Sequence, residues 1–240
     1  MFKNLLILFF CINSVCVFSE QEHFLVGTNA EFPPFCYIEN NAIVGFDIDV
    51  AKEVGKKLNR SIQFKDIPFD ALIPDVVLGH LDFVAAGMSY TDERVKRVAF
   101  TKSYIFKDPL VILTISKQIT SVDDLKGKNV VVIEGFTADL FISAIDGIHL
   151  TRLPTQADGF MALKSRRADA FVTAKSTVNA FYDVQNASNF HASELEGTGE
   201  TCALVVPKNN PKLLMDIQKA LDEMENDGTL MQLRIKWKLQ

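Results

Sequence analysis

The chain has 240 residues, of which 48% are hydrophobic and 23% charged, with 12 glycines and 8 prolines. This composition excludes a disordered, collagen-like or coiled-coil chain, and the length suffices for one large domain or two of about 100 residues. The formal charge of −5 argues against a nucleic-acid-binding protein, because phosphate recognition needs a concentrated basic surface.

Residues 1–19 have the pattern of an export signal. Lys3 precedes an apolar run at Leu5–Ile12, and Val17 and Ser19 fit a small-residue cleavage site before Glu20. We predict a secretory signal peptide rather than a membrane anchor, because the run is shorter than the roughly 20 residues that cross a bilayer. The mature chain is therefore expected in the periplasm.

The cysteines divide between the signal and the mature chain. A lipid anchor on Cys16 is the minor alternative to cleavage, since the residues before it match a lipoprotein signal poorly. Cleavage removes Cys11, Cys16 and Lys3, which changes the formal charge from −5 to −6. Cys36 and Cys202 remain, and the sequence leaves open whether they pair or stay separate thiols.

Strands and helices alternate through the first half of the mature chain. The helix is indicated by Val50, Val54 and Leu58 at four-residue spacing, and the paired prolines exclude a helix from the preceding loop. In order we predict a strand at His23–Thr28, a loop at Asn29–Phe35, a turn at Asn40–Asn41, a helix from Phe46, a strand at Ser61–Ile67, a helix at Phe69–Leu78 and a strand at Asp82–Ala86.

The alternation then repeats. We predict strands at Leu110–Ser116, Asn129–Ile133, Leu150–Leu153, Ala170–Thr173 and Cys202–Val206, and helices at Ser121–Leu125, Thr137–Ile145, Ala157–Arg166, Ser176–Val184 and Pro211–Leu239, the last broken at Asp227–Gly228. Two α/β units of similar size imply two lobes with a cleft between them, which is a preferred place for a ligand.

Motifs of common enzymes are absent from the sequence. It contains no Walker P-loop, no HExxH and no GxSxG, its four histidines lack metal-ligand spacing, and the GTG at Gly197–Gly199 reads as a turn. The sequence therefore favours binding over catalysis, with no catalytic residue, cofactor or metal expected.

Four segments carry a family resemblance. They are VGTNAEFPPFCY with VGFDIDVAKEVGKKL within Val26–Leu58, Phe69–Tyr104 with AGMSYTDER, DDLKGKNVVVIEGFTADLF at Asp123–Phe141, and NDGTLMQLRIKWK at Asn226–Lys238. In this order they resemble the periplasmic amino-acid-binding proteins of ABC importers, the polar amino-acid type of bacterial solute-binding protein family 3. The resemblance covers essentially the whole mature chain.

The resemblance implies a type II two-lobed α/β fold, each lobe a mostly parallel sheet flanked by helices, joined by two hinge strands. The expected division is a signal peptide at 1–19, a first lobe at 20–102 and 199–240, and a second lobe at 103–198. It further implies a monomer that is not an enzyme, captures an amino-acid-like small molecule and delivers it to an ABC permease.

From the first lobe, the resemblance assigns Arg94 to the ligand's α-carboxylate, and Gly87 and Ser89 to its α-ammonium. A guanidinium suits a carboxylate because it donates two parallel charge-assisted hydrogen bonds. The alternative for Arg94 is a surface salt bridge within the charged stretch Asp92–Arg97. Phe32 and Phe69 correspond to walls around the ligand's side chain, whereas Phe35 is assigned to the core.

From the second lobe, Gly135, Phe136 and Thr137 follow a strand and begin a helix. Helix N-termini present unpaired N–H groups to anions, so Thr137 is expected to hold the carboxylate that Arg94 binds from the other side. Such a ligand bridges the lobes and favours their closure. The alternative is that Thr137 only caps its helix.

The sequence departs from the family where an acid usually pairs with the ligand's amine, since this position is Ala174. Glu31 and Glu200 are candidate replacements; otherwise carbonyls and Ser89 serve, or the ligand lacks a free amine. Asn29 and Cys36 stand where binders of basic amino acids often carry acids, which weakens an arginine or lysine assignment. Lys175 favours an acidic or uncharged ligand unless it is simply solvated.

Two other function classes stay open. The same fold resembles that of periplasmic dehydratases that act on prephenate-like substrates. Their chemistry needs a positioned general acid or base, and Ala174 stands where the expected carboxylate would be. A sensory or adhesive exported protein with the same two lobes is the third possibility.

Overall fold

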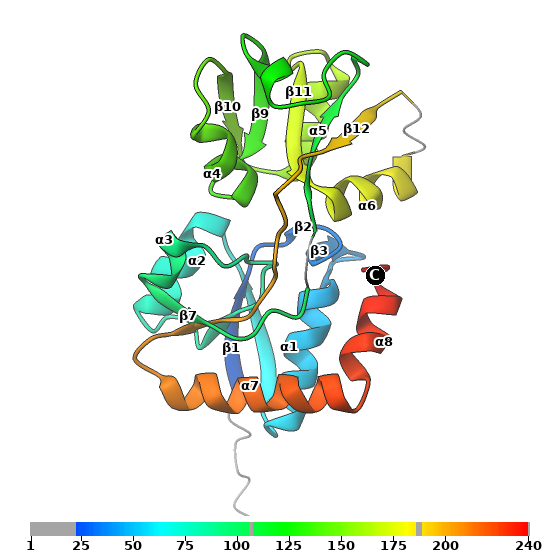
Figure 1. Ribbon diagram of the computed structural model, residues 1–240. Helices are drawn as coiled ribbons and strands as arrows, with labels where there is room; N and C mark the ends of the chain where they lie inside the picture. Colours follow the sequence, from blue (N-terminus) through cyan, green and yellow to red (C-terminus); the bar gives the residue numbers. More distant parts are fainter. Residues whose placement is uncertain (1–22, 106–107, 186–188, 240) are drawn as a thin grey trace, which may run out of the picture.

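The computed structural model describes residues 23–105, 108–185 and 189–239, so the predicted signal peptide lies outside the described residues. Figure 1 shows two lobes, one above the other, each with a sheet flanked by helices. The chain passes between the lobes twice, once between strands β7 and β8 and once between β12 and β13.

The first lobe holds a five-stranded sheet in the order β5-β1-β6-β13-β7. Its strands are β1 (His23–Thr28), β5 (Ser61–Asp66), β6 (Phe83–Val84), β7 (Val98–Phe100) and β13 (Val205–Pro207). Its helices are α1 (Phe46–Lys57), α2 (Phe69–Val77), α3 (Asp92–Val95), α7 (Pro211–Asn226) and α8 (Thr229–Lys236). β1 is parallel to β5 and β6, whereas β13 returns from the end of the chain and pairs antiparallel with β6 and β7.

A small antiparallel sheet follows β1, formed by β2 (Glu31–Phe32), β3 (Cys36–Glu39) and β4 (Ala42–Val44). The sequence predicted a loop and a turn here. The turn is present, since Asn40 and Asn41 both have positive φ, at 49° and 61°, a backbone region that asparagine tolerates. The strands themselves are too short to give a clear alternating pattern.

The second lobe holds a sheet in the order β10-β9-β11-β8-β12. Its strands are β8 (Leu110–Thr114), β9 (Asn129–Ile133), β10 (His149–Leu153), β11 (Ala170–Ala174) and β12 (His191–Glu194), and its helices are the 3-10 turn η1 (Asp123–Leu125), α4 (Thr137–Ser143), α5 (Gln156–Lys164) and α6 (Lys175–Gln185). Alternate residues of the central strands enter two different buried clusters, as Ile112 and Leu113 illustrate. Helices cover both faces, which explains the continuous apolar runs in the sequence.

Several predicted elements are shorter or were missed. The strand predicted at Cys202–Val206 is β13, and Cys202 makes only an isolated bridge to Ser89. The helix expected at Ser121–Leu125 is a single 3-10 turn. β12, α3 and β7 were not predicted, because each has only three or four residues and little hydrophobic periodicity.

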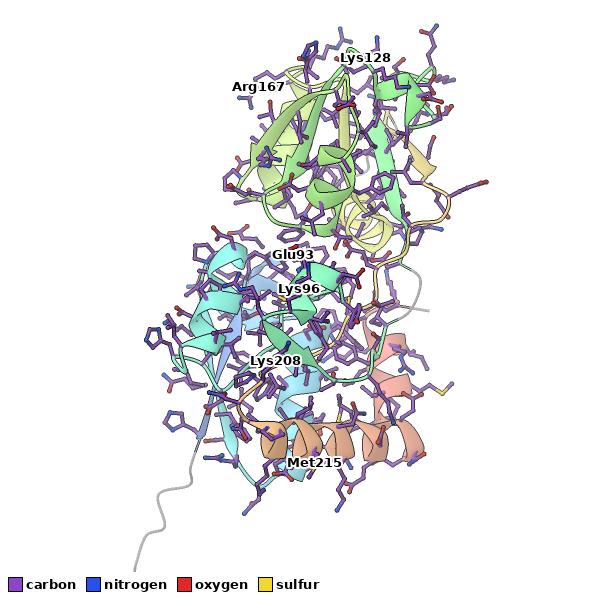
Figure 2. All side chains as sticks on the ribbon, turned by 60° about the vertical axis from the view of Figure 1, so that its left-hand side comes forward. Glu93, Lys96, Lys128, Arg167, Lys208 and Met215 are labelled. Atoms are coloured by element: carbon purple, nitrogen blue, oxygen red, sulfur yellow. The ribbon has the colours of Figure 1, made fainter. Side chains whose placement is uncertain are left out.

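The outer surfaces carry charged side chains. Figure 2 places Lys128 and Arg167 at the end of the second lobe that is far from the first, and Met215 of α7 at the opposite end of the molecule. Glu93 and Lys96, beside Arg94 in sequence, lie at the edge of the first lobe that faces the second. α3 therefore stands at the boundary between the lobes.

Among the described helices, none combines the length and the apolar character of a membrane-spanning segment. Cys36 and Cys202 are buried free thiols, so the structure resolves the open alternative in favour of separate cysteines.

Candidate functional site

Aromatic rings from both lobes meet at the boundary. The ring centroid of Phe136, from the second lobe, lies 5.0 Å from that of Phe32 and 4.4 Å from that of Phe69, both from the first. The guanidinium carbon of Arg94 lies 5.3 Å from the Phe69 centroid, a distance at which a cation is attracted to the ring face. Phe32, Phe69 and Phe136 therefore form one cluster with Arg94, the residue predicted to bind the ligand's carboxylate.

Arg94 is held in this cluster by its helix and by backbone carbonyls. Thr91 caps α3 by accepting a hydrogen bond from the Arg94 N–H at 3.2 Å. The side chain is only 6% exposed, and it donates to the Ser89 carbonyl at 2.7 Å and to the Gly135 carbonyl of the other lobe at 3.0 Å. These bonds use two of five N–H donors. Arg94 is therefore a buried cation between the lobes, and the alternative of a surface salt bridge is wrong.

Gly87 and Ser89 form the loop beneath Arg94. Gly87 has a φ of +60°, and a Cβ there would lie 2.7 Å from the Phe32 ring, so only glycine fits. Ser89 is 3% exposed, and its hydroxyl has no hydrogen-bond partner among the described residues. Burying an unpaired hydroxyl is unfavourable, and such a group is suited to a ligand atom.

A buried acid that sequence reasoning missed supports this loop. Asp47, in α1, accepts hydrogen bonds through Oδ2 from the Gly87 N–H at 2.6 Å and from the Tyr104 hydroxyl at 2.9 Å. Burial raises the pKa of Asp47 to about 7, against the opposing effect of these hydrogen bonds. A signal was available, because Asp47 stands between the apolar residues Phe46 and Ile48 at the start of a helix.

The second lobe contributes the start of α4. Gly135 has a φ of +74° and donates its N–H to Asp139 Oδ2 at 3.0 Å, which fixes the turn into the helix. Phe136 occupies the N-cap without a side-chain cap, so Thr137 is the first helical residue and not the cap that the alternative supposed. The Thr137 side chain interacts with the Glu200 carboxylate and lowers its pKa.

Glu200 and Ala174 share the space between the rings and the second sheet. Both residues line a narrow gap together with Phe32, Ile133, Phe136, Ala138, Val172 and Thr173. Glu200 is 4% exposed, and burial raises its pKa to about 7; Asp108 raises it further, while Thr137 and Arg94 act in the opposite direction. An acid therefore does lie beside Ala174, supplied by another segment.

The other charged candidates lie elsewhere. Glu31 is exposed, and its pKa is raised by partial burial and by the neighbouring carboxylates of Asp66 and Asp158. Lys175 pairs with Glu194 on the surface. Of the two acids considered as replacements at the amine position, only Glu200 lines the gap.

Asn29, Phe35 and Cys36 make contacts within the first lobe. The Asn29 amide donates to the Ile67 carbonyl at 3.3 Å, and the Cys36 thiol donates to the Asn29 carbonyl at 3.1 Å. Phe35 is fully buried, with its ring centroid 4.9 Å from that of Phe32, as the core assignment expects. These contacts lie within the first lobe next to Phe32, and they do not bring Asn29 into the cluster around Arg94.

Comparison with known proteins identifies relatives over nearly the whole chain. Residues 24–240 match the profile of the bacterial extracellular solute-binding proteins, family 3. A putative ABC transporter arginine-binding protein 2 of Escherichia coli (strain K12) is 32% identical over 217 residues, covering 88% of each chain. A probable histidine-binding protein of Campylobacter jejuni is 30% identical over 217 residues, covering 90% of this chain and 84% of the relative.

Solved structures agree in fold. An ancestral arginine-binding protein bound to arginine superposes with a TM-score of 0.85 at 37% identity, covering 90% of this chain and 97% of that one. An ancestral arginine-binding protein bound to glutamine gives a TM-score of 0.85 at 36% identity, covering 91% and 98%. The predicted two-lobed fold is confirmed by these matches.

Proposed function

The chain belongs to family 3 of the bacterial extracellular solute-binding proteins, and we propose that it is the receptor of an amino-acid ABC importer. It captures one amino acid between its lobes and delivers it to a membrane permease. The observation that carries the proposal is the buried guanidinium of Arg94, which reaches from the first lobe to the loop that begins α4. We further propose export to the periplasm by the signal at 1–19 and action as a monomer without catalysis.

The α-carboxylate of the ligand binds between Arg94 and the start of α4. Arg94 retains N–H donors beyond the two that hold it in place, and it stays charged despite burial that lowers its pKa. The Thr137 N–H and hydroxyl face the carboxylate from the second lobe, where the first turn of a helix lacks internal acceptors for its N–H groups. Both lobes thus hold one ligand group.

The rest of the ligand lies against the neutral part of the cluster. The Ser89 hydroxyl and the Gly87 carbonyl serve the α-ammonium, and the unpartnered state of the Ser89 hydroxyl supports this role. Phe32, Phe69 and Phe136, whose rings contact one another, form an aromatic wall against which the ligand's side chain packs. Gly135 shapes the turn and Asn29 supports the first-lobe wall.

The ligand favours closure of the lobes, because only the closed protein contacts it from both sides. We assign residues 20–102 and 199–240 to the first lobe and 103–198 to the second. The division is supported by the sheets, since β13 lies between β6 and β7 while β8 to β12 form the other sheet. The two crossings between the lobes then act as the hinge.

A thermal-shift screen with the twenty L-amino acids tests the proposal. At least one should raise the melting temperature, because a ligand that binds only the folded state stabilises it by RT ln(1 + [L]/Kd). Mass spectrometry of the small molecules released by gentle denaturation identifies a co-purifying ligand independently. A flat screen together with no released amino acid would contradict the receptor function.

A further inference from the structure

We propose that Glu200, on the segment that crosses back from the second lobe, is the counter-ion of the ligand's α-ammonium. The inference rests on the proposed function and names a specificity-determining residue of the same site. An amino acid is a zwitterion, so a cleft that binds its carboxylate through a cation must also accommodate a cation a few ångströms away. Of the residues that line the described gap, Glu200 is the one that carries an acid.

The backbone of the hinge fixes where Glu200 lies. Its N–H donates to the Asp108 carbonyl at 2.7 Å, and the Asp108 N–H donates to the Glu200 carbonyl at 3.2 Å, so the two crossings are paired at this point. The Glu200 side chain is buried beside Ala174, at the end of β11. A residue fixed by both crossings keeps its position relative to the cleft better than one on a free loop.

The Glu200 carboxylate has no described ion-pair partner. Arg94 interacts with it electrostatically, but among the described ion pairs none joins the two side chains within 4.0 Å, and Arg94 donates to carbonyls instead. Asp108 repels it, while Asp108 itself accepts hydrogen bonds from the Ser176 N–H and hydroxyl. A buried carboxylate is stabilised by an ammonium, which offers three N–H donors in one place.

Thr137 connects the two halves of such a site. Its side chain interacts with Glu200, and it is the first residue of α4. Arg94 and Thr137 both act on the Glu200 carboxylate, so a cation, a neutral donor and an anion lie near one another. This arrangement matches the charge distribution of a free α-amino acid, and it discriminates against the same molecule without its amine.

The test compares three amino acids with analogues that lack only the α-amine. The probes are L-arginine, L-histidine and L-glutamine, and guanidinopentanoate, imidazolepropionate and glutaramate, each titrated by calorimetry. Proteins are the wild type, Glu200→Gln, Glu200→Asp, Glu200→Gln with Ala174→Asp, and the control Glu196→Gln, which removes an exposed acid from the same segment. Melting temperatures verify that each variant folds.

For whichever amino acid the wild type binds, Glu200→Gln should weaken binding at least tenfold while the deamino analogue changes less than twofold. Ala174→Asp should restore several-fold of the lost affinity, because it supplies a carboxylate to the same gap. Glu200→Asp should retain the preference for the amine if the glutamine variant folds poorly, and Glu196→Gln should match the wild type.

An unchanged ratio between amino acid and deamino analogue in Glu200→Gln would overturn the role of Glu200, as would tighter binding, which would mean that Glu200 blocks the carboxylate site. Both results presuppose that the wild type binds an amino acid. If it binds none of the probes and none in the wider screen, the proposed function itself fails.

Discussion

The two faces of the cleft are built differently. On the first-lobe face, Gly87 donates to the buried carboxylate of Asp47 and packs against Phe32, while the Ser89 hydroxyl is left without a described protein partner. On the second-lobe face, β11 ends in Ala174, and the charge comes from Glu200 on the hinge. The first face is preformed by packing, whereas the second depends on how the lobes are joined.

This difference suggests where affinity and specificity reside. The preformed face supplies a rigid cation and aromatic walls, which bind any ligand with a carboxylate and a side chain that fits. The second-lobe face, here called the hinge face because its charge comes from Glu200, supplies the group that distinguishes a ligand with an amine from one without it. Variants that damage one face and spare the other separate these two contributions.

Arg94→Ala should have the largest effect, since it removes the cation of the preformed face. Two hydrogen bonds to a charged group contribute about 1.5–3 kcal/mol each, so affinity should fall more than about 100-fold. Calorimetry with the best ligand from the screen measures this loss. Arg97→Ala, an exposed arginine three residues later, is the matched control and should bind as the wild type does. Equal affinity of Arg94→Ala and wild type would remove Arg94 from the site.

Gly87→Ala should destabilise the preformed face through two effects. A left-handed backbone costs a non-glycine residue about 1 kcal/mol, and overpacking against Phe32 adds about 1–3 kcal/mol. Gly79→Ala is the control, because Gly79 also has positive φ, at +77°, but its Cβ would meet nothing within 4 Å. The melting temperature of Gly87→Ala should therefore lie several degrees below that of Gly79→Ala, at about 2–4 °C per kcal/mol. Identical melting temperatures would show that the Phe32 wall is not packed as described.

The affinity for an amino acid should depend on pH through the hinge face. With the pKa of Glu200 raised to about 7, the residue is largely protonated below pH 7, and an ammonium ligand must displace that proton. Affinity should therefore fall about tenfold per pH unit below 7 and level off above it. Asp108, Arg94 and Cys202 also face this carboxylate. Glu200→Gln should flatten the profile, which would assign the slope to Glu200; a slope that persists in this variant would assign it to a neighbour.

Asp47→Asn should have the smallest effect on ligand affinity, because its effect is confined to the pH dependence of stability. The folded protein holds the proton of Asp47 more tightly than the unfolded chain does, because the pKa is raised from 3.8 to about 7. Its stabilising contribution is complete below about pH 4 and is lost as pH rises toward 7, with a slope of at most about 1.4 kcal/mol per unit.

Asparagine does not titrate, so Asp47→Asn should gain stability relative to the wild type between pH 4 and pH 7. Thermal unfolding across this range measures the difference, with the exposed Asp146→Asn as control. A constant difference across the range would mean that Asp47 does not titrate there.

The sequence predicted the regular parts of both lobes, because their patterns are local. β1 and β9 were predicted with their observed bounds, and α1 and α7 begin at the predicted residues, Phe46 and Pro211. Arg94, Gly87 and Ser89 of the preformed face were identified as candidates through the family resemblance of the segment that contains them. The ligand roles of these residues remain predictions.

The features that could not be predicted from the sequence depend on contacts between residues far apart in the chain. Glu200 and Ala174 are 26 positions apart, and only the pairing of Glu200 with Asp108 brings the acid to the end of β11. Asp47 meets Gly87 and Tyr104 through packing of α1 against the first sheet, which no local pattern records. β12 was missed because its alternating polar residues resemble a loop.

A crystal structure of the protein with its amino acid would show whether Arg94 and Thr137 hold the ligand between the lobes. We expect one amino acid between the lobes, with its carboxylate oxygens within about 3 Å of the Arg94 guanidinium and of the Thr137 N–H or hydroxyl. The ammonium should point to Ser89 and Glu200. A ligand bound outside this gap, or one whose carboxylate contacts neither Arg94 nor Thr137, would contradict it.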